Sequence, residues 1–173
     1  MLNTLKRNSL KIDPLELNCD WLWEGSLKAP RRYMQKFSAL MWTHLCNERD
    51  FARVAKTKRM DLEISVLVVG KRRAKEFNFK YRKRNYATDV LSFPGAGVCG
   101  DLVLCDEVIK KNAHLNRVPF REELAYVFLH GVLHLFGFDH ETSLEDEKHM
   151  LGLQDRVFDK IMRALGSRSR LTF

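Results

Sequence analysis

The stretch that decides the fold is HGVLHLFGFDH, residues 130–140. It carries His130 and His134 four residues apart, so on a helix both imidazoles lie on the same face. Gly137 can leave that helix in a left-handed conformation, which turns the chain back and lets His140 approach the same point. Three imidazoles around one point suit a zinc-like ion whose fourth position stays open, as in catalytic zinc sites. The stretch therefore predicts a helix that ends in a metal site.

The same stretch matches the zinc-protease pattern HExxHxxGxxH at every position but one. Gly131 stands where a metalloprotease carries the glutamate that serves as general base. A zinc peptidase is therefore the weaker alternative, and a hydrolase that relies on the ion itself to acidify water is the stronger one. The overlap makes a zincin-like fold the expectation. The metal stays open, because three imidazoles bind nickel or copper as well as zinc.

Hydrophobic periodicity predicts an α+β fold, in which a small mixed sheet is packed with helices around a buried central metal-binding helix. That central helix begins near residue 119 and is apolar almost all round, which is typical of a buried helix. Strands are expected at 15–19, 62–69, 89–93 and 100–105, the last two antiparallel. Other helices are expected over 30–56 (one long or two short), from 71, over 106–114 with Asp106 as N-cap, and from 143 to 165. No repeat or linker divides the chain, so one domain over residues 1–173 is expected.

Composition favours a globular protein of the cytoplasm. Hydrophobic residues make up 45% of the chain and charged residues 30%, which is ordinary for such proteins. No apolar run reaches the length of a membrane span, and the first residues lack the apolar core of a secretion signal. The four cysteines are scattered without a CxxC pair, so we expect reduced thiols rather than a disulfide framework.

The formal net charge of +8 suggests an anionic partner, and its distribution is more informative than its total. The densest run of basic residues comprises Lys71, Arg72, Arg73, Lys75, Lys80, Arg82, Lys83 and Arg84. Acidic residues gather elsewhere, after residue 140. This asymmetry favours nucleic acid over acidic protein, because phosphates present dense, repeated charge. Taken alone, the run is equally compatible with an ordinary solvated surface.

Two motifs resemble those of one family. Residues 130–140 resemble the signature HGxLHLxG[YF]DH of the YbeY family of ribosomal-RNA maturation endoribonucleases. Residues 81–94, YRKRNYATDVLSFP, resemble the second signature of that family, and residues 100–104 match its GDIxI strand. The order and spacing agree over about residues 62–165. Phe138 departs from the pattern, since tyrosine is commoner there, and the loop at 95–99 is short.

The resemblance implies a single-strand-specific, metal-dependent endoribonuclease in ribosomal RNA processing, maturation and ribosome quality control. It implies that His130, His134 and His140 hold one zinc-like ion, with nickel or another transition metal as alternative. It also implies an important arginine, Arg82, which as a planar bidentate donor could clamp a phosphate. Asp139 either orients an imidazole or belongs to the turn that leaves the helix. The implied partners are single-stranded RNA, ribosomal RNA and the small ribosomal subunit; the oligomeric state stays open.

Two alternatives of other classes remain beside the endoribonuclease. The first is a non-catalytic RNA-binding ribosome assembly factor whose metal is structural. The second is the zinc peptidase, which Gly131 and the basic surface disfavour. An open fourth position on the metal distinguishes the endoribonuclease from the assembly factor.

Overall fold

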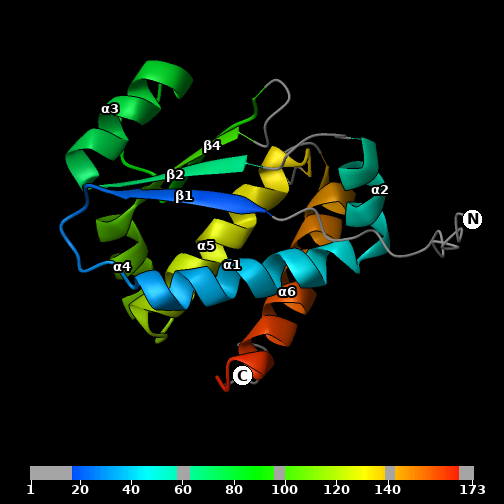
Figure 1. Cartoon of the computed structure of the whole chain (residues 1–173). Coiled ribbons are helices and arrows are strands. Elements are labelled where there is room, and N and C mark those ends of the chain that lie inside the picture. Colours follow the sequence, from blue (N-terminus) through cyan, green and yellow to red (C-terminus); the bar gives the residue numbers. More distant parts are fainter. Residues whose placement is uncertain (1–16, 58–62, 96–99, 139–142, 168–173) are drawn as a thin grey trace, which may run out of the picture.

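One mixed sheet forms the centre of the fold in the computed structural model, which describes residues 17–57, 63–95, 100–138 and 143–167 (Figure 1). Its strands are β1 (Asn18–Trp23), β2 (Glu63–Val69), β3 (Val90–Phe93) and β4 (Gly100–Cys105). They lie in the order β1-β2-β4-β3. The pairs β1–β2 and β2–β4 are parallel, whereas β3 is antiparallel to β4. The mixed sheet and the antiparallel pair predicted from the sequence are thus confirmed.

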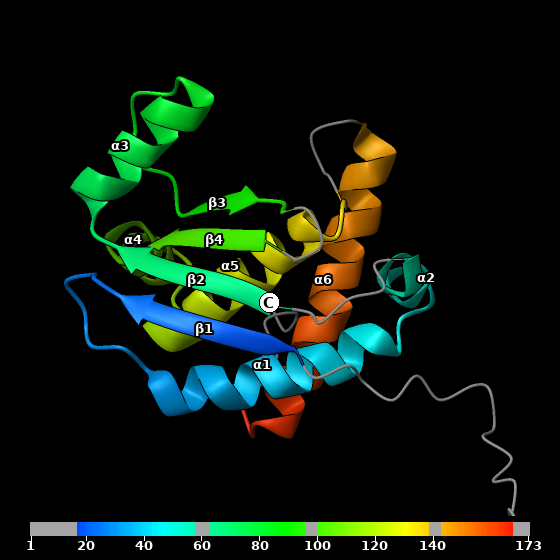
Figure 2. The ribbon, with the colours of Figure 1, turned by 45° about the horizontal axis from the view of Figure 1, so that its top comes forward.

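The helices divide unequally between the two faces of the sheet. The described helices are α1 (Arg31–Cys46), α2 (Arg49–Thr57), α3 (Lys71–Arg82), α4 (Asp106–Leu115), α5 (Phe120–Leu135) and α6 (Leu144–Ala164). Beneath the sheet lies α5, with α1 and α6 packed around it, whereas α3 stands on the opposite side (Figures 1 and 2). Of the described helices, only α3 covers that second face. The fold is therefore a sheet with one thickly covered face and one thinly covered face.

The main core lies between α5 and the sheet. On β2, Ile64, Val66 and Val68 are buried on the α5 side, because alternate residues of a strand point to opposite faces. On α5, Phe128 and Val132 are fully buried, as expected of a helix that is apolar almost all round. Helix α5 is therefore buried in the core between the sheet and the other helices.

The first strand differs from expectation. It lies at Asn18–Trp23, because the alternation of half-buried and exposed side chains continues through Trp21 and Trp23. Residues 15 and 16 of the expected strand lie outside the described residues. The region 30–56, expected as one long helix or two short ones, forms two. Helix α1 ends at Cys46, and the backbone N–H of the next residue, Asn47, donates to carbonyls of the last turn.

Asp106 is not the N-cap of α4; that prediction was wrong. Cys105 holds the cap position, and the Asp106 carboxylate is fully buried. Its Oδ2 accepts a hydrogen bond of 2.8 Å from the backbone N–H of Leu27. The side chain is therefore turned away from the first turn of its own helix and fixes the connection between β1 and α1. The predicted cap of α6 is confirmed, since Ser143 Oγ accepts from the backbone N–H of Asp146 at 3.1 Å.

The described cysteines carry free thiols, namely Cys19, Cys46 and Cys105. Burial raises the pKa of the Cys46 thiol to about 11, and burial is also the first cause that raises the pKa of Cys105. Both thiols therefore stay protonated and unreactive near neutral pH. Among the described helices, none is both long and apolar enough to cross a lipid bilayer.

Candidate metal centre

His130 and His134 lie on consecutive turns at the C-terminal end of α5, with their rings turned toward each other. Their Nε2 atoms are 3.1 Å apart. The ring planes are inclined at 77° and the centroids lie 4.7 Å apart. Two nitrogens bound about 2.0–2.1 Å from a tetrahedral ion lie about 3.3 Å apart. The two nitrogens are thus spaced as two ligands of one ion.

A buried glutamine fixes the protonation of the first histidine. Gln154 on α6 is fully buried, and its Oε1 lies 2.9 Å from His130 Nδ1. Gln154 Nε2 donates to the carbonyl of Tyr126 at 3.3 Å, which fixes the amide so that its oxygen faces the imidazole. Because an amide oxygen only accepts, the proton of a neutral His130 is on Nδ1 and the lone pair is on Nε2. This is the state in which Nε2 can bind a metal.

Gln154 was not predicted from the sequence. Its only signal is a polar residue on the apolar stripe of α6, where the neighbours Met150, Leu153 and Val157 are buried. A buried side-chain amide needs a partner, so that position indicates a polar contact inside the core. Nothing in the sequence identifies His130 as that partner, because the two residues are brought together only by the packing of α5 against α6.

Gly131 brings α5 into close contact with the sheet. A Cβ at this position would lie 2.9 Å from Leu102 Cδ2 and 3.1 Å from Val90 Cγ2. The hydroxyl of Ser92 on β3 donates to the Gly131 carbonyl at 3.3 Å. A glutamate here would direct its carboxylate into the apolar contact between α5 and the sheet. The position is therefore shaped for packing and not for the general base of a peptidase.

The chain leaves α5 at Gly137, which adopts the left-handed conformation predicted from the sequence. Gly137 has φ of +86°, and its N–H donates to the His134 carbonyl at 3.0 Å. Phe138 follows, half-buried and stacked on Phe51 with 6.1 Å between centroids. The chain is thus turned back at the position expected. The predicted ligand His140 lies outside the described residues, as does Asp139, and the described residues alone hold no cluster of three metal-binding side chains.

Arg82 is the last residue of α3, on the other side of the sheet from α5. Its side chain is exposed, and it makes no hydrogen bond or ion pair within the described residues. The next residue, Lys83, adopts a left-handed conformation with φ of 59° and ends the helix. The described contacts bring His130 and His134 together and leave Arg82 apart from them, open to an external anion.

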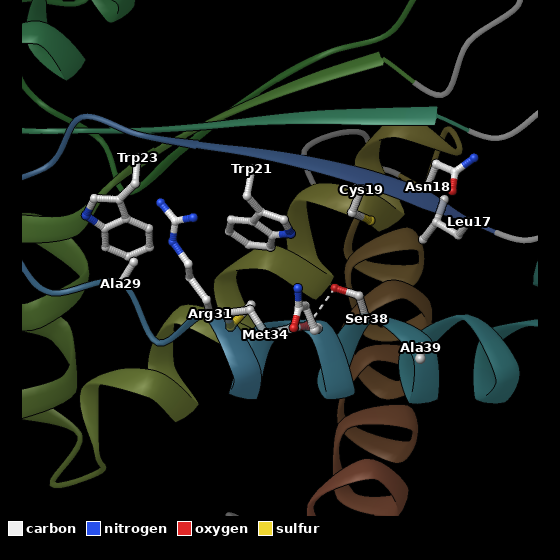
Figure 3. Close-up of a pocket in the computed structure, with 11 residues that line it drawn as sticks. Leu17, Asn18, Cys19, Trp21, Trp23, Ala29, Arg31, Met34, Ser38 and Ala39 are labelled. Atoms are coloured by element: carbon white, nitrogen blue, oxygen red, sulfur yellow. Dashed lines mark hydrogen bonds between the residues drawn. The ribbon is translucent and has the colours of Figure 1, made fainter.

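A separate cavity of about 380 Å³ lies between β1 and α1 (Figure 3). The guanidinium of Arg31 lies between the indoles of Trp21 and Trp23 in this view. Trp21 also packs against Phe128 of α5, with 5.0 Å between ring centroids. Because β1 and β3 are the two opposite edges of the sheet, this cavity is not part of the histidine site, which adjoins β3.

Comparisons with known proteins agree on one family. The family model described as Endoribonuclease YbeY matches residues 32–162. A protein named Endoribonuclease YbeY from Bdellovibrio bacteriovorus is 37% identical over 147 residues, covering 84% of this chain and 95% of the relative. One of the same name from Petrotoga mobilis is 40% identical over 106 residues, covering 60% of this chain and 73% of the relative.

The fold also matches a solved structure. The solution structure of TM1509 from Thermotoga maritima superposes with a TM-score of 0.56 at 25% sequence identity. The match covers 86% of this chain and 91% of that chain. The architecture described above is therefore shared over most of the length of both chains.

Proposed function

The chain belongs to the YbeY family of endoribonucleases, and from this premise we propose that it cuts single-stranded RNA with one metal ion held by His130, His134 and His140. The observation that carries the metal proposal is the pair of Nε2 atoms 3.1 Å apart, with the proton of His130 held on Nδ1 by Gln154. The third ligand rests on the signature and on the left-handed turn at Gly137 that precedes it.

The donor set fits a zinc-like ion, with nickel or another transition metal as alternative, because neutral imidazoles bind all of these. When bound, such an ion supplies Lewis acidity toward water and toward the phosphate oxygens. The protein supplies orientation. Gln154 keeps the proton of His130 on Nδ1, and Ser92 ties the edge strand to the helix that carries both histidines.

Arg82 is proposed as the phosphate-binding residue. Its planar guanidinium can donate two parallel hydrogen bonds to phosphate oxygens and stabilise the negative charge that develops there during cleavage. Its exposure and the lack of a partner among the described residues leave the guanidinium available for this contact. Asp139 keeps the two roles expected from the sequence, a partner of an imidazole or a residue of the turn.

The finer features of the proposal follow from the family. We propose ribosomal RNA and the small ribosomal subunit as partners, the cytoplasm as location, and a single domain over residues 1–173 with a zincin-like arrangement around α5. The basic run on α3 supports an RNA partner, since its side chains lie exposed along one helix.

The test is cleavage of an end-labelled single-stranded RNA by the metal-loaded protein beside His134→Ala, Arg82→Ala and Arg163→Ala variants purified identically. Arg163 is the control, because it is an exposed arginine in the last turn of α6, outside the basic run on α3. We expect His134→Ala to abolish cleavage and Arg82→Ala to lower its rate by about 100-fold, the scale of one lost charge-stabilising donor. Arg163→Ala should cut like the wild type.

The other functions predict other outcomes. Equal cleavage by all four proteins would show a contaminating ribonuclease and contradict the proposal. Tight RNA binding without cleavage by the metal-loaded wild type would favour the ribosome assembly factor. Cleavage of a model peptide that depends on His134 would favour the peptidase, against the packing found at Gly131.

A further inference from the structure

The second face of the sheet is only partly covered. Near the C-terminal end of β2, Val69, Ala74 and Val103 are buried between α3 and the strands. The strand register aligns Leu22, Leu67 and Val103 as one apolar row across β1, β2 and β4. Leu22, at the edge of this row, is 59% exposed. An apolar row thus runs from beneath α3 onto an open part of the sheet.

A groove of about 420 Å³ lies where α3 leaves the sheet. Its lining residues are Ser65, Leu67, Phe77, Tyr81, Phe93, Asp101, Leu102 and Val103. Figures 1 and 2 show α3 standing away from the sheet over these strands. The groove therefore has an apolar floor from the sheet and one wall from a helix.

That wall is aromatic. The rings of Phe77 and Tyr81 are nearly parallel, inclined at 11° with centroids 6.2 Å apart. Phe93 of β3 meets Tyr81 edge-on, with 4.9 Å between centroids. Tyr81 is 51% exposed although it belongs to this cluster. A half-exposed ring held between two others offers a rigid flat face to a ligand, at little cost in side-chain entropy.

Cations on α3 border the aromatic wall and form the basic rim of the groove, since Arg73 Cζ lies 5.7 Å from the centre of the Phe77 ring. The exposed basic residues of α3 and of the turn after it are Lys71, Arg72, Arg73, Lys75, Lys80, Arg82, Lys83 and Arg84. Lys80 Nζ lies 5.0 Å from the centre of the Tyr81 ring. Aromatic faces beside a line of cations are the combination that binds single-stranded nucleic acid, because bases stack while phosphates pair with the cations. Asp101 and Ser65 offer acceptors that suit the N–H edges of bases rather than phosphates.

One strand separates this groove from the histidine helix. On β3, the Ser92 hydroxyl reaches the Gly131 carbonyl on one face, while the next residue, Phe93, contacts Tyr81 on the other. β3 is also an edge strand, so on its outer side it pairs with no other strand of the described sheet. An RNA strand crossing this edge would have a phosphate on the α5 side and its neighbouring bases on the α3 side.

We propose that the groove walled by Phe77, Tyr81 and Phe93 stacks unpaired bases of the RNA substrate beside the cleavage site. The identity of the ligand as RNA rests on the proposed function, whereas the groove, its aromatic wall and its basic rim are features of the structure. In this role Tyr81 is the main stacking residue, and it makes the protein prefer unpaired over paired RNA.

The test is the affinity for a fluorescein-labelled single-stranded RNA of about ten nucleotides, measured by fluorescence anisotropy with the metal removed by chelator. We expect Tyr81→Ala to weaken binding about tenfold, the scale of one lost stacking contact, and Tyr81→Phe to bind like the wild type. The matched control is Phe79→Ala. Phe79 is 56% exposed on the same basic helix but does not line the groove. A 2-aminopurine base in the RNA should be quenched by the wild type and not by Tyr81→Ala.

Equal affinities of Tyr81→Ala and Phe79→Ala would overturn the proposal. So would an equal loss by Tyr81→Ala on a duplex of the same length, because that outcome would assign Tyr81 to holding α3 in place. The measurement needs no turnover, so it separates the groove from cleavage. If the wild type bound RNA through Tyr81 but did not cleave it, the proposed metal-dependent nuclease activity would be contradicted. The proposal that the groove stacks unpaired bases would still be supported.

Discussion

The proton on His130 Nδ1 depends on one buried amide of a different helix. Gln154 Oε1 accepts a hydrogen bond of 2.9 Å from His130 Nδ1–H, and Gln154 Nε2 donates to the carbonyl of Tyr126. Because Gln154 is fully buried, where an unpaired polar group is costly, these two contacts hold the amide in one orientation. The lone pair of Nε2, the nitrogen proposed to bind the metal, is thus available before any ion binds.

Substitutions of Gln154 test whether its side-chain amide fixes the proton of His130 on Nδ1. Gln154→Met keeps most of the volume and removes the acceptor, and we expect the zinc affinity to fall about 10-fold to 100-fold, the range for lost partners of metal-bound histidines. Gln154→Glu is the matched variant, because it keeps an acceptor oxygen and should keep the affinity. The measurement is a zinc competition titration against a chromophoric chelator, and equal affinities of Gln154→Met and the wild type would contradict the role given to the amide.

At the scale of the element, α5 serves both the core and the candidate metal site. Its buried side chains fill the space under the sheet, and its last two turns carry the histidines. Gly131 stands between those histidines, at the point of closest approach to Leu102 and Val90. The helix can approach this closely because that residue has no side chain, and the approach sets the position of both imidazoles relative to β3.

Introducing at position 131 the glutamate that zinc proteases carry is therefore expected to destabilise the fold without creating a peptidase. Gly131→Glu places a bulky carboxylate in the apolar contact, and we expect the free energy of unfolding to fall by about 3 kcal/mol or more. Gly152→Glu is the matched control on α6, where a Cβ meets only Arg156 at 3.4 Å. That variant should be stabilised by up to about 1 kcal/mol through helix propensity. Urea denaturation and a peptide-cleavage assay check both, and peptidase activity in Gly131→Glu would contradict this account.

At the scale of the whole molecule, the junction of α1 with α6 makes stability depend on pH. Burial lowers the pKa of His44 from 6.5, the nearby Lys160 lowers it further, and Glu48 opposes both. The folded state therefore disfavours the charged imidazole. Above pH 6.5 His44 is neutral in both states, and below it the unfolded chain takes up the proton more readily, so stability is lost as the pH falls.

We expect the urea midpoint of the wild type to fall more than that of His44→Gln between about pH 7.5 and 5.5. The other histidines are present in both proteins, so the difference between the two profiles isolates His44. Parallel profiles would show that this imidazole has the same pKa in the folded and unfolded states, contrary to the burial seen here.

Much of the fold could be predicted from the sequence, and the features that could not be predicted have a physical reason. The central helix, the β3–β4 pair and the turn at Gly137 follow from local patterns, because helical period, strand alternation and a left-handed glycine are local properties. The roles of Asp106 and Gln154 were not predictable. Each side chain bonds a residue far away in the sequence, Leu27 in one case and His130 in the other. Such contacts depend on packing rather than on the neighbouring sequence.

The late position of α5 in the chain has a consequence for the order of folding during synthesis. β1 and α1 are made first, yet their apolar sides pack against a helix that begins only at Phe120. β1 must also wait for β2, from which α1 and α2 separate it. The first half of the nascent chain therefore has no finished core to join while it leaves the ribosome. The hydrogen bond between Gln154 and His130 forms still later, once α6 has been made, so a partly made chain lacks the contact that fixes the proton of His130 at the candidate metal site.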